Sequence, residues 1–436
     1  MAEARTGEGG TLEPEGYRPR LLEGRLDALM AAFGCVEIVG AKWCGKTWTA
    51  LSRARSATRL DRADERAAAE VDPALALVGE APHLVDEWQE VPGVWDASRR
   101  LVDDAGGRRG LLLLTGSTAL RPAEREEVRH SGAGRIARLR MRPMSLAESG
   151  ESTRQVSLAS LLGGAPLPPA RRETQVAEVA EWCCRGGWPA TAGLPLGVAL
   201  ETPSQYVQAA LDVNVAEEGR SPATALALMR ALAMNAGRAV TAKTLMADTA
   251  ASGAELGPDA LASYLELLDR LYITEPLGGW EPPMRAKARV RVRPKRCFVD
   301  PSLAAALMGA TPERLLADTQ ALGDLFEGLV LRDLRVYLST YPGLGNGVHY
   351  YRDDKGLEVD AIVERGGAWG AVEVKLSDTK ADEAAASLLR LRRKLCENPM
   401  ARTPEPAFLA VVVGRGALAY RRPDGVLVIP AATLTA

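Results

Sequence analysis

Short apolar segments alternate with helical patterns along the first third of the chain, which is typical of an α/β domain with a parallel sheet. Residues 21–30 carry a helical stripe of leucine and methionine, and the apolar run at 35–39 that follows reads as a buried strand. Further strands are predicted at 82–86, at 111–115 and, where arginine alternates with apolar residues, at 138–142. The pattern therefore predicts an N-terminal α/β domain.

A complete G-x-x-x-x-G-K-T phosphate loop follows the first predicted strand. Its residues are Gly40, Ala41, Lys42, Trp43, Cys44, Gly45, Lys46 and Thr47. Glycines let the backbone N–H groups wrap phosphates, Lys46 is expected to reach the β- and γ-phosphates, and the hydroxyl of Thr47 is expected to bind Mg²⁺. The strand and helix on either side favour a site for ATP and Mg²⁺ over a turn that binds nothing.

Two adjacent acids end the second apolar run, the pattern called Walker B. Asp86 is expected to hold Mg²⁺ through its water shell, and Glu87 to orient and deprotonate the attacking water. Sharing the metal with Thr47 requires, on this interpretation, that the strand before Asp86 lies directly beside the strand before the phosphate loop. The Arg- and Asp-rich stretch at 56–70 is expected to be a solvated connector.

Polar residues also accompany the remaining two predicted strands. Thr115 or Ser117 is placed to sense the γ-phosphate, although a Gly-Ser pair also suits a plain turn. Arg135, at a Gly-rich entrance to the last strand, is a candidate arginine finger supplied by a neighbouring subunit. A surface salt bridge is the alternative for Arg135. The first interpretation predicts a homo-oligomer.

Together these motifs resemble those of prokaryotic AAA-type ATPases that carry a C-terminal domain of unknown function. Besides the phosphate loop, the resemblance rests on Tyr17–Arg20, Val85–Gln89, Leu114–Ser117, Gly134–Ile136 and Arg142–Ser149. It extends from about residue 17 to residue 422, and the family usually has arginine where this chain has Lys42. The resemblance implies an AAA-type P-loop domain, a winged-helix region and an α+β restriction-endonuclease-like C-terminal domain.

The middle of the chain shows helical patterns after a Gly- and Pro-containing stretch at 155–169 that looks like a linker. Residues 185–189 read as a tight turn, and residues 223–299 read as a winged helix with its third helix at 259–271. That helix is mainly acidic, so direct reading of a DNA groove is not expected. Basic residues lie instead on the predicted wing, at Arg285, Lys287, Arg289, Arg291, Arg293, Lys295 and Arg296. They suit the phosphates of DNA or RNA, or protect an edge strand from aggregation, and both alternatives remain open.

A predicted hairpin near the C-terminus brings charged residues together. With residues 366–367 as a two-residue turn, counting back places Asp360 opposite Glu373 and Glu358 opposite Lys375. Carboxylates that face each other repel unless a cation or proton lies between them. The alternative is a plain Glu358–Lys375 ion pair that leaves Asp360 and Glu373 solvated.

Asp360, Glu373 and Lys375 form the arrangement of restriction-endonuclease-like nucleases. There the acids hold Mg²⁺, and the lysine activates water or stabilises the phosphate. Glu327, on a largely apolar face of a predicted helix at 321–337, is expected to point into the same site. The C-terminal region therefore has two candidate roles, cleavage of DNA or RNA and recognition of a partner.

Composition limits the remaining function classes. A chain of 436 residues is expected to form about two to four domains. The predicted divisions are a disordered tail at 1–16, a P-loop ATPase domain at 17–150, a linker and helical region at 151–222, a winged-helix-like domain at 223–299 and a nuclease-like domain at 300–436. A net charge of −2 gives no overall attraction to nucleic acid or anionic membrane.

The sequence contains no signal peptide and no apolar run that would span a bilayer, which excludes a membrane partner and makes the cytoplasm the expected location. Six scattered cysteines and three histidines support neither a zinc site nor a disulfide framework. The leading prediction is Mg²⁺-dependent ATP hydrolysis. The alternative is a non-catalytic switch that uses ATP to change conformation and recognises a protein or nucleic acid through its C-terminal domain.

Overall fold

The computed structural model describes residues 10–436 except 118–129, 282–292, 344–346, 399–402 and 404. The chain divides into two compact units. Unit 1 runs to Pro143 and includes Arg270–Tyr272, and unit 2 contains Met144–Asp269 and Ile273–Ala436. Of the tail predicted at 1–16, residues 1–9 lie outside the described residues. Leu12, in its second part, donates a backbone hydrogen bond to Ala54 O at 2.8 Å.

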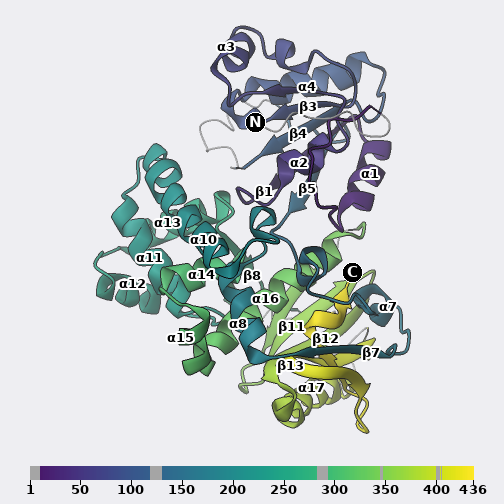
Figure 1. Cartoon of the computed structure of the whole chain (residues 1–436), viewed down its shortest axis with the longest axis vertical. Helices are drawn as coiled ribbons and strands as arrows, with labels where there is room; N and C mark the ends of the chain where they lie inside the picture. Colours follow the sequence, from purple (N-terminus) through teal and green to yellow (C-terminus); the bar gives the residue numbers. More distant parts are fainter. Residues whose placement is uncertain (1–9, 118–129, 282–292, 344–346, 399–402, 404) are drawn as a thin grey trace. The chain divides into compact units, whose positions relative to one another are not determined.

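Unit 1 contains a five-stranded sheet in the order β2-β3-β4-β1-β5, and every neighbouring pair of strands is parallel (Figure 1). The strands are β1 Cys35–Gly40, β2 Ser56–Arg59, β3 His83–Asp86, β4 Leu112–Gly116 and β5 Ile136–Met141. All residues of β1, β3 and β4 are buried, which explains their nearly continuous apolar character. Four of the five strands were predicted from the sequence: β1, β3 and β4 from their apolar runs, and β5 from its alternation of arginine with apolar residues.

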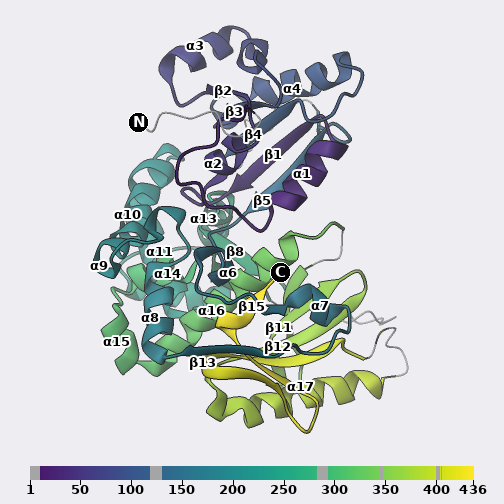
Figure 2. The same ribbon diagram turned by 45° about the vertical axis from the view of Figure 1, so that its right-hand side comes forward.

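Helices and short turns connect these strands. They are α1 Glu23–Ala32, α2 Lys46–Leu51, α3 Ala63–Val71, the 3₁₀ turns η1 Pro73–Leu77 and η2 Trp88–Glu90, and α4 Gly93–Asp104. Helix α1 lies beside the sheet near β1 (Figure 2). On α4, Val94, Trp95 and Val102 join a buried cluster with Leu112 and Leu114 of β4. This packing fixes the carboxyl edge of the sheet, where β1, β3 and β4 end.

Two sequence predictions for unit 1 are wrong. The strand that carries Asp86 does not lie directly beside β1, because β4 lies between them: Leu114 pairs with Glu37 on one side and with Val85 on the other. The strand richest in leucine thus takes an interior place. The stretch at 56–70 is not only a solvated connector, since Ser56–Arg59 forms the edge strand β2, whose residues are half-buried or exposed.

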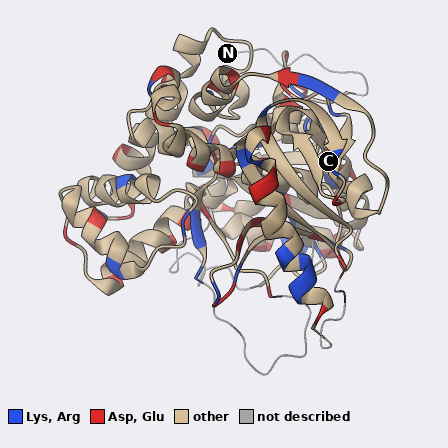
Figure 3. Ribbon diagram, turned by 90° about the horizontal axis from the view of Figure 1, so that it is seen from below, with Lys and Arg blue, Asp and Glu red and all other residues tan. Residues whose placement is uncertain are grey.

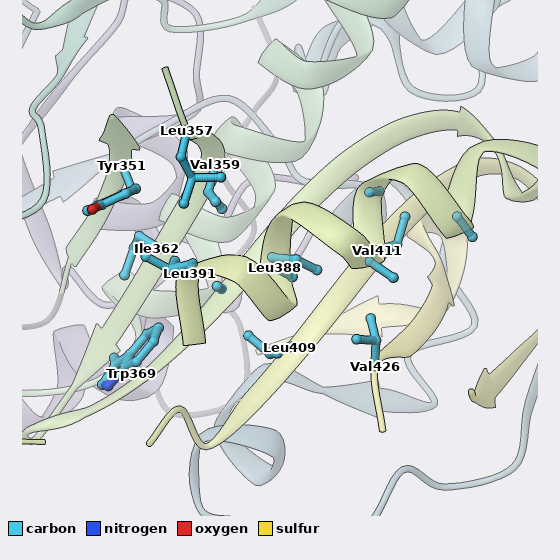
Figure 4. Close-up of a cluster of buried hydrophobic side chains, with 14 of the residues drawn as sticks. Tyr351, Leu357, Val359, Ile362, Trp369, Leu388, Leu391, Leu409, Val411 and Val426 are labelled. Carbon is cyan, nitrogen blue, oxygen red and sulfur yellow. The ribbon is translucent and has the colours of Figure 1, made fainter. Parts of the chain in front are cut away.

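Unit 2 contains a second sheet in the order β10-β11-β12-β13-β14, with β7 also paired to β13. These strands are β7 Ala170–Thr174, β10 Gly347–Arg352, β11 Glu358–Arg365, β12 Ala368–Ser377, β13 Phe408–Arg421 and β14 Leu427–Pro430. Helix α17, Ala381–Cys396, packs its leucines against the sheet around Val411 (Figure 4). The long helix α16, Thr319–Ser339, also contacts the sheet and carries Glu327.

The remaining helices and strands of unit 2 surround that sheet or form the helical part of the unit. They are α6 Leu146–Ser149, β6 Val156–Ser157, α7 Leu158–Leu162, α8 Val176–Arg185, η3 Pro189–Thr191, α9 Leu196–Ala199, α10 Glu201–Ala209, the π-helix η4 Ala210–Val215, α11 Pro222–Met234, α12 Ala242–Ala251, α13 Pro258–Arg270, β8 Thr274–Leu277, β9 Lys295–Phe298, α14 Pro301–Leu307, α15 Pro312–Ala317, the 3₁₀ turns η5 Asp378–Lys380 and η6 Ala431–Thr433, and β15 Leu434–Thr435. No helix in the described part of the chain is long and apolar enough to cross a membrane.

The predicted linker at 155–169 is instead largely folded into unit 2. Strand β6 pairs with β15 near the C-terminus, and Leu158, Leu161 and Leu162 of α7 are buried. The apolar side chains that precede its glycines and prolines need cover, which a free linker would not provide.

Helices α11, α12 and α13 and the antiparallel pair β8–β9 follow the order predicted for a winged helix. Assignment to that fold stays a prediction. Of the predicted wing, residues 285–291 lie outside the described residues. Lys295 is buried against acids and Arg296 pairs with Asp269 at 2.8 Å, so these two charges do not form the expected phosphate-binding face.

Candidate active site

The phosphate loop connects β1 to α2 in a conformation that requires glycine. Gly40 has φ of 148°, and a Cβ there would lie 2.0 Å from Met141 O on the adjacent strand β5. The ammonium of Lys46 folds back over the loop and donates to Gly40 O at 3.0 Å and to Ala41 O at 2.8 Å. The loop thus holds its lysine over its own carbonyls, at the place where phosphates are expected to bind.

Arg20 anchors this loop, and sequence reasoning did not assign it a role. Its guanidinium is buried and donates to Cys44 O at 2.7 Å and to Arg142 O at 2.8 Å. Cys44 is itself fully buried, so its side chain fills space beneath the loop. Arg20 lies in the Tyr17–Arg20 segment on which the family resemblance rests, and this was the one signal in the sequence that pointed to it.

Asp86, at the end of β3, gathers hydroxyl groups from two other elements. Thr47 Oγ1 of α2 donates to Asp86 Oδ1 at 2.9 Å, and Thr115 Oγ1 of β4 donates to the same oxygen. Burial raises the pKa of Asp86, while these two hydrogen bonds oppose that shift. Thr115 therefore contacts the predicted metal ligand, and not the predicted water-activating acid.

Glu87 is held in an unusual backbone conformation, with φ of 54°. Ser117 Oγ, just beyond β4, donates to Glu87 Oε2 at 3.0 Å, and Gln89 Nε2 donates to the same oxygen. A left-handed conformation at a residue other than glycine is costly and is found preferentially at functional sites. The structure therefore brings together Thr47, Asp86, Glu87 and Ser117.

A buried carboxylate lies behind this group and was not predicted. Glu37, in the middle of β1, accepts hydrogen bonds from Arg138 Nε of β5 at 2.6 Å and from Trp88 Nε1 at 3.2 Å. Burial raises the pKa of Glu37, and the contacts with Arg138 and Trp88 oppose the shift. Because Trp88 follows Glu87 directly, Glu37 fixes the turn that carries the predicted catalytic acid.

Arg135 lies where the strands of this sheet begin, at the end opposite to the phosphate loop. Its carbonyl accepts a hydrogen bond from Cys35 N at the start of β1, whereas the phosphate loop follows the end of β1. Its side chain is half exposed and forms a salt bridge with Asp103 at 2.7 Å. Arg135 is thus about 15–20 Å along the strand from its own phosphate loop. A role as arginine finger in a neighbouring subunit stays a prediction.

In unit 2 the register of the predicted hairpin is confirmed from the turn to Ala361 and Val372. Arg365 pairs with Ala368 and Ala361 pairs with Val372. Lys375 Nζ lies 2.7 Å from Glu373 Oε2 and 3.6 Å from Asp360 Oδ2. The expected alternative, a Glu358–Lys375 ion pair beside solvated acids, does not form, since Lys375 turns to the other two carboxylates and Glu373 is only 5% exposed.

Lys295 supplies a second cation that sequence reasoning placed on the wing. Its ammonium lies 2.8 Å from Glu358 Oε1 and 3.1 Å from Glu327 Oε1, and the residue is 1% exposed. Burial alone would lower the pKa of Lys295, but the surrounding carboxylates raise it. Figure 3 shows that acidic and basic segments are interspersed in the described chain.

The acids around Lys295 and Lys375 differ in how well they suit a metal ion. Burial, followed by repulsion from Asp360, raises the pKa of Glu373 and of Glu327 to about 8. Repulsion between Asp360 and Glu373 is what a cation or a proton relieves, and Lys375 already lies beside both acids, just as Lys295 lies beside Glu327. Among the described residues, no three acid, histidine or cysteine side chains gather closely enough to hold a metal ion.

Three protein families match successive parts of the chain. Residues 33–150 match an AAA domain, residues 176–314 a domain of unknown function, DUF8612, and residues 322–434 a domain of unknown function, DUF4143. The N-terminal part is therefore an AAA-type P-loop domain. No curated protein matches the chain in a sequence comparison.

Solved structures similar to this chain include the Walker-type ATPase PABY2304 of Pyrococcus abyssi, at 13% identity and a TM-score of 0.42, covering 68% of this chain and 97% of that one. The Orc1 protein of Aeropyrum pernix in complex with DNA has 12% identity and a TM-score of 0.24, covering 70% of this chain and 95% of that one. Protein VC1899 from Vibrio cholerae has 11% identity and a TM-score of 0.19, covering 91% and 94%. Likeness at these low scores carries no argument about function.

Proposed function

We propose that unit 1 binds ATP together with Mg²⁺ and hydrolyses the nucleotide. The observation that carries the proposal is the meeting of Thr47, Asp86, Glu87 and Ser117 at the carboxyl edge of one parallel sheet, beside the loop that holds Lys46. The match of residues 33–150 to an AAA domain supports the same activity.

The residues present fit Mg²⁺ at this site. Magnesium prefers oxygen ligands, and the Thr47 hydroxyl and the Asp86 carboxylate already face each other at 2.9 Å. The raised pKa of the buried Asp86 reports a carboxylate that a nearby cation would stabilise in its charged form. Thr47 and Asp86 would hold the metal, which would supply positive charge to neutralise the charge that develops on the phosphates.

Each remaining residue then has a defined task. Lys46 exchanges its contacts with the carbonyls of Gly40 and Ala41 for the β- and γ-phosphates. Glu87 orients the attacking water and accepts its proton, and Ser117 holds the Glu87 carboxylate in position. The phosphate-binding cation, the proton acceptor and the serine that positions this acceptor thus come from three neighbouring segments of the sheet edge.

Phosphate release from ATP by the full chain and by Lys46→Ala tests the proposal. We expect the variant to lose ATP binding and turnover, because the phosphates lose their buried cation. Arg62→Ala, which removes an exposed cation from the same unit, is the matched control and should retain both. Turnover that persists in Lys46→Ala would refute the assignment.

A second candidate function, metal-dependent cleavage of DNA or RNA, belongs to unit 2. It is favoured by the contact of Lys375 with both Glu373 and Asp360. Asp360 and Glu373 fit a cation as a pair, and a bound metal would polarise a phosphodiester and lower the pKa of a water molecule. Lys375 is then placed to stabilise the additional charge on the phosphate, and Glu327 is the candidate third acid.

Cleavage of single- and double-stranded substrates by the wild-type chain and by Asp360→Ala tests this second function. We expect metal-dependent products from the wild type and none from the variant. Asp353→Ala, which alters an acid that pairs with Lys394, is the control. Absence of cleavage by the wild type would favour the partner-recognition role for unit 2, which a salt titration of nucleic-acid binding would examine next.

A further inference from the structure

Gln89, two residues beyond the predicted catalytic acid, holds that acid through one end of its side-chain amide. It belongs to the turn η2, and its Nε2 donates a hydrogen bond to Glu87 Oε2, the oxygen that also accepts from Ser117 Oγ. No described residue donates to the other carboxylate oxygen, Oε1, of the half-buried Glu87. Two donors thus fix one oxygen of Glu87 and leave the second one open to a water molecule.

The oxygen of the Gln89 amide, Oε1, is buried and accepts no hydrogen bond from any described residue. Reversing the amide would not help, because Oε1 of Gln89 would then lie against Glu87 Oε2, and both atoms are acceptors. A buried acceptor without a donor lowers the stability of a fold. The chain therefore keeps the amide on Glu87 although the other end of that amide is destabilising, which indicates that the contact serves function.

Gly116, the last residue of β4, leaves the space that this amide occupies. A Cβ at Gly116 would lie 2.8 Å from Gln89 Oε1, closer than two such atoms approach. The residues before and after the glycine, Thr115 and Ser117, donate hydrogen bonds to the two acids that follow β3. Because successive side chains along a strand point to opposite sides, the glycine lies toward the amide and its two neighbours toward the acids. The end of β4 thus accommodates Gln89 as well as the acidic pair.

We propose that Gln89 is a positioning residue for hydrolysis, which holds the Glu87 carboxylate so that its second oxygen receives the attacking water. This inference rests on the proposed function of the same site, because Glu87 has this task only if ATP is hydrolysed there. Gln89 acts together with Ser117, and the two donors come from different elements, η2 and the end of β4. Rotation of the carboxylate away from the water would break both hydrogen bonds at once.

Steady-state ATP hydrolysis and equilibrium ATP affinity of the full chain and of Gln89→Leu test the proposal. Leucine is close in size to glutamine, and it removes the hydrogen bond to Glu87 together with the buried amide oxygen. We expect kcat to fall about 2- to 12-fold, the equivalent of one hydrogen bond, while ATP affinity and the midpoint of thermal unfolding stay close to those of the wild type. Gln208→Leu is the matched control, because it removes an amide contact with the carboxylate of Asp212 at an exposed position.

Gly116→Ala tests the same role and leaves the amide itself in place. The added methyl group must displace Gln89 Oε1, which lies at the end of a flexible side chain, so the amide moves off Glu87. We expect kcat to fall as it does in Gln89→Leu. In the Gln89→Ala background, where that space is empty, Gly116→Ala should cause no further fall, whereas independent substitutions would add their effects. Gly24→Ala, whose Cβ would meet nothing within 4 Å, is the control.

The outcomes separate this inference from the proposed function. If kcat of Gln89→Leu equals that of the wild type, or if Gly116→Ala acts equally with and without the Gln89 side chain, the positioning role is overturned while ATP hydrolysis stands. A loss of ATP affinity as large as the loss of kcat would overturn it too, because Gln89 would then act in binding. If Gln89→Leu does not fold, the comparison of Gly116→Ala with the double variant decides. If the wild type does not hydrolyse ATP, the proposed function itself fails, and the role of Gln89 with it.

Discussion

Ser117 Oγ donates a hydrogen bond to Glu87 Oε2 at 3.0 Å, which joins the end of β4 to the residue that follows β3. The link exists because β4 lies between β1 and β3, so its end is next to both the phosphate loop and the acidic pair. The serine is buried, and the glutamate it contacts has a left-handed backbone conformation. Side chain and backbone together limit where the carboxylate can point.

Ser117→Ala removes this hydrogen bond and leaves Glu87 with the contact from Gln89. We expect kcat for ATP hydrolysis to fall about 2- to 12-fold, the equivalent of one hydrogen bond, with little change in ATP affinity. Steady-state phosphate release and equilibrium ATP binding measure the two quantities. Ser131→Ala, at an exposed position, is the control. An unaltered kcat would show that Ser117 does not position Glu87.

Arg20 offers a test of how the phosphate loop is held. Arg20→Lys keeps the charge but cannot reproduce the two-pronged contact with Cys44 O and Arg142 O. We expect a loss of about 1.5–3 kcal/mol in the free energy of unfolding and weaker ATP binding. Denaturant unfolding and nucleotide titration measure these effects, with Arg18→Lys at an exposed position as the control. ATP affinity equal to that of the wild type would contradict an anchoring role.

The buried Glu37 predicts a dependence of stability on pH. Because burial raises its pKa in the folded state, the folded chain keeps this proton to a higher pH than the unfolded chain, whose ordinary value is 4.5. The stability that Glu37 contributes is therefore fully present below 4.5 and is lost as pH rises through the folded-state pKa. The free energy of unfolding should fall more steeply with pH in the wild type than in Glu37→Gln. Glu70→Gln, at an exposed position, is the control. Equal slopes for the wild type and Glu37→Gln would contradict this contribution of Glu37 to the pH dependence of stability.

Lys295 predicts the largest change in stability. Lys295→Met leaves the carboxylates of Glu327 and Glu358 without their buried ammonium, so we expect a loss of about 3–5 kcal/mol in the free energy of unfolding. Lys394→Met removes a more exposed ammonium that pairs with Asp353 at 2.7 Å and should cost about 1 kcal/mol.

A double variant separates lost charge pairing from lost packing at Lys295. Lys295→Met combined with Glu327→Gln should regain part of the stability, because the glutamine carries no charge. Comparable losses for Lys295→Met and Lys394→Met in denaturant unfolding would contradict the assignment of Lys295 to the acid cluster.

The sequence was sufficient to locate the strands whose burial makes them largely apolar, and it was not sufficient to order them. The strand at residues 112–116 was expected, yet its place between β1 and β3 depends on contacts between segments far apart in the chain. The edge strand β2 escaped detection because an edge tolerates the polar residues that Ser56–Arg59 contains. The register of β11 and β12 was predictable. Two glycines set a tight turn, and the alternation of charged and apolar residues determined which residues share a face of the hairpin.

The candidate sites likewise contain residues that the sequence located and residues that it misplaced or missed. Motifs with short spacing, such as the phosphate loop and the Asp86–Glu87 pair, are readable from the chain alone. Lys295 was misplaced because alternation of basic and apolar residues indicates an exposed strand, while its burial is decided by Glu327 and Glu358, which lie 32 and 63 residues further on. Glu37 was missed for the same reason, since its partners Arg138 and Trp88 come from other strands and turns.

The most direct test of the central claim, that this site hydrolyses ATP as well as binding it, is phosphate release by the wild type and by Glu87→Gln, with ATP affinity measured on the same samples. Glutamine keeps the size of the side chain but cannot accept the proton of the attacking water. We predict that ATP affinity stays close to that of the wild type while kcat falls about 100- to 10,000-fold, the usual contribution of a general base. Turnover of ATP by Glu87→Gln at the wild-type rate would contradict the account.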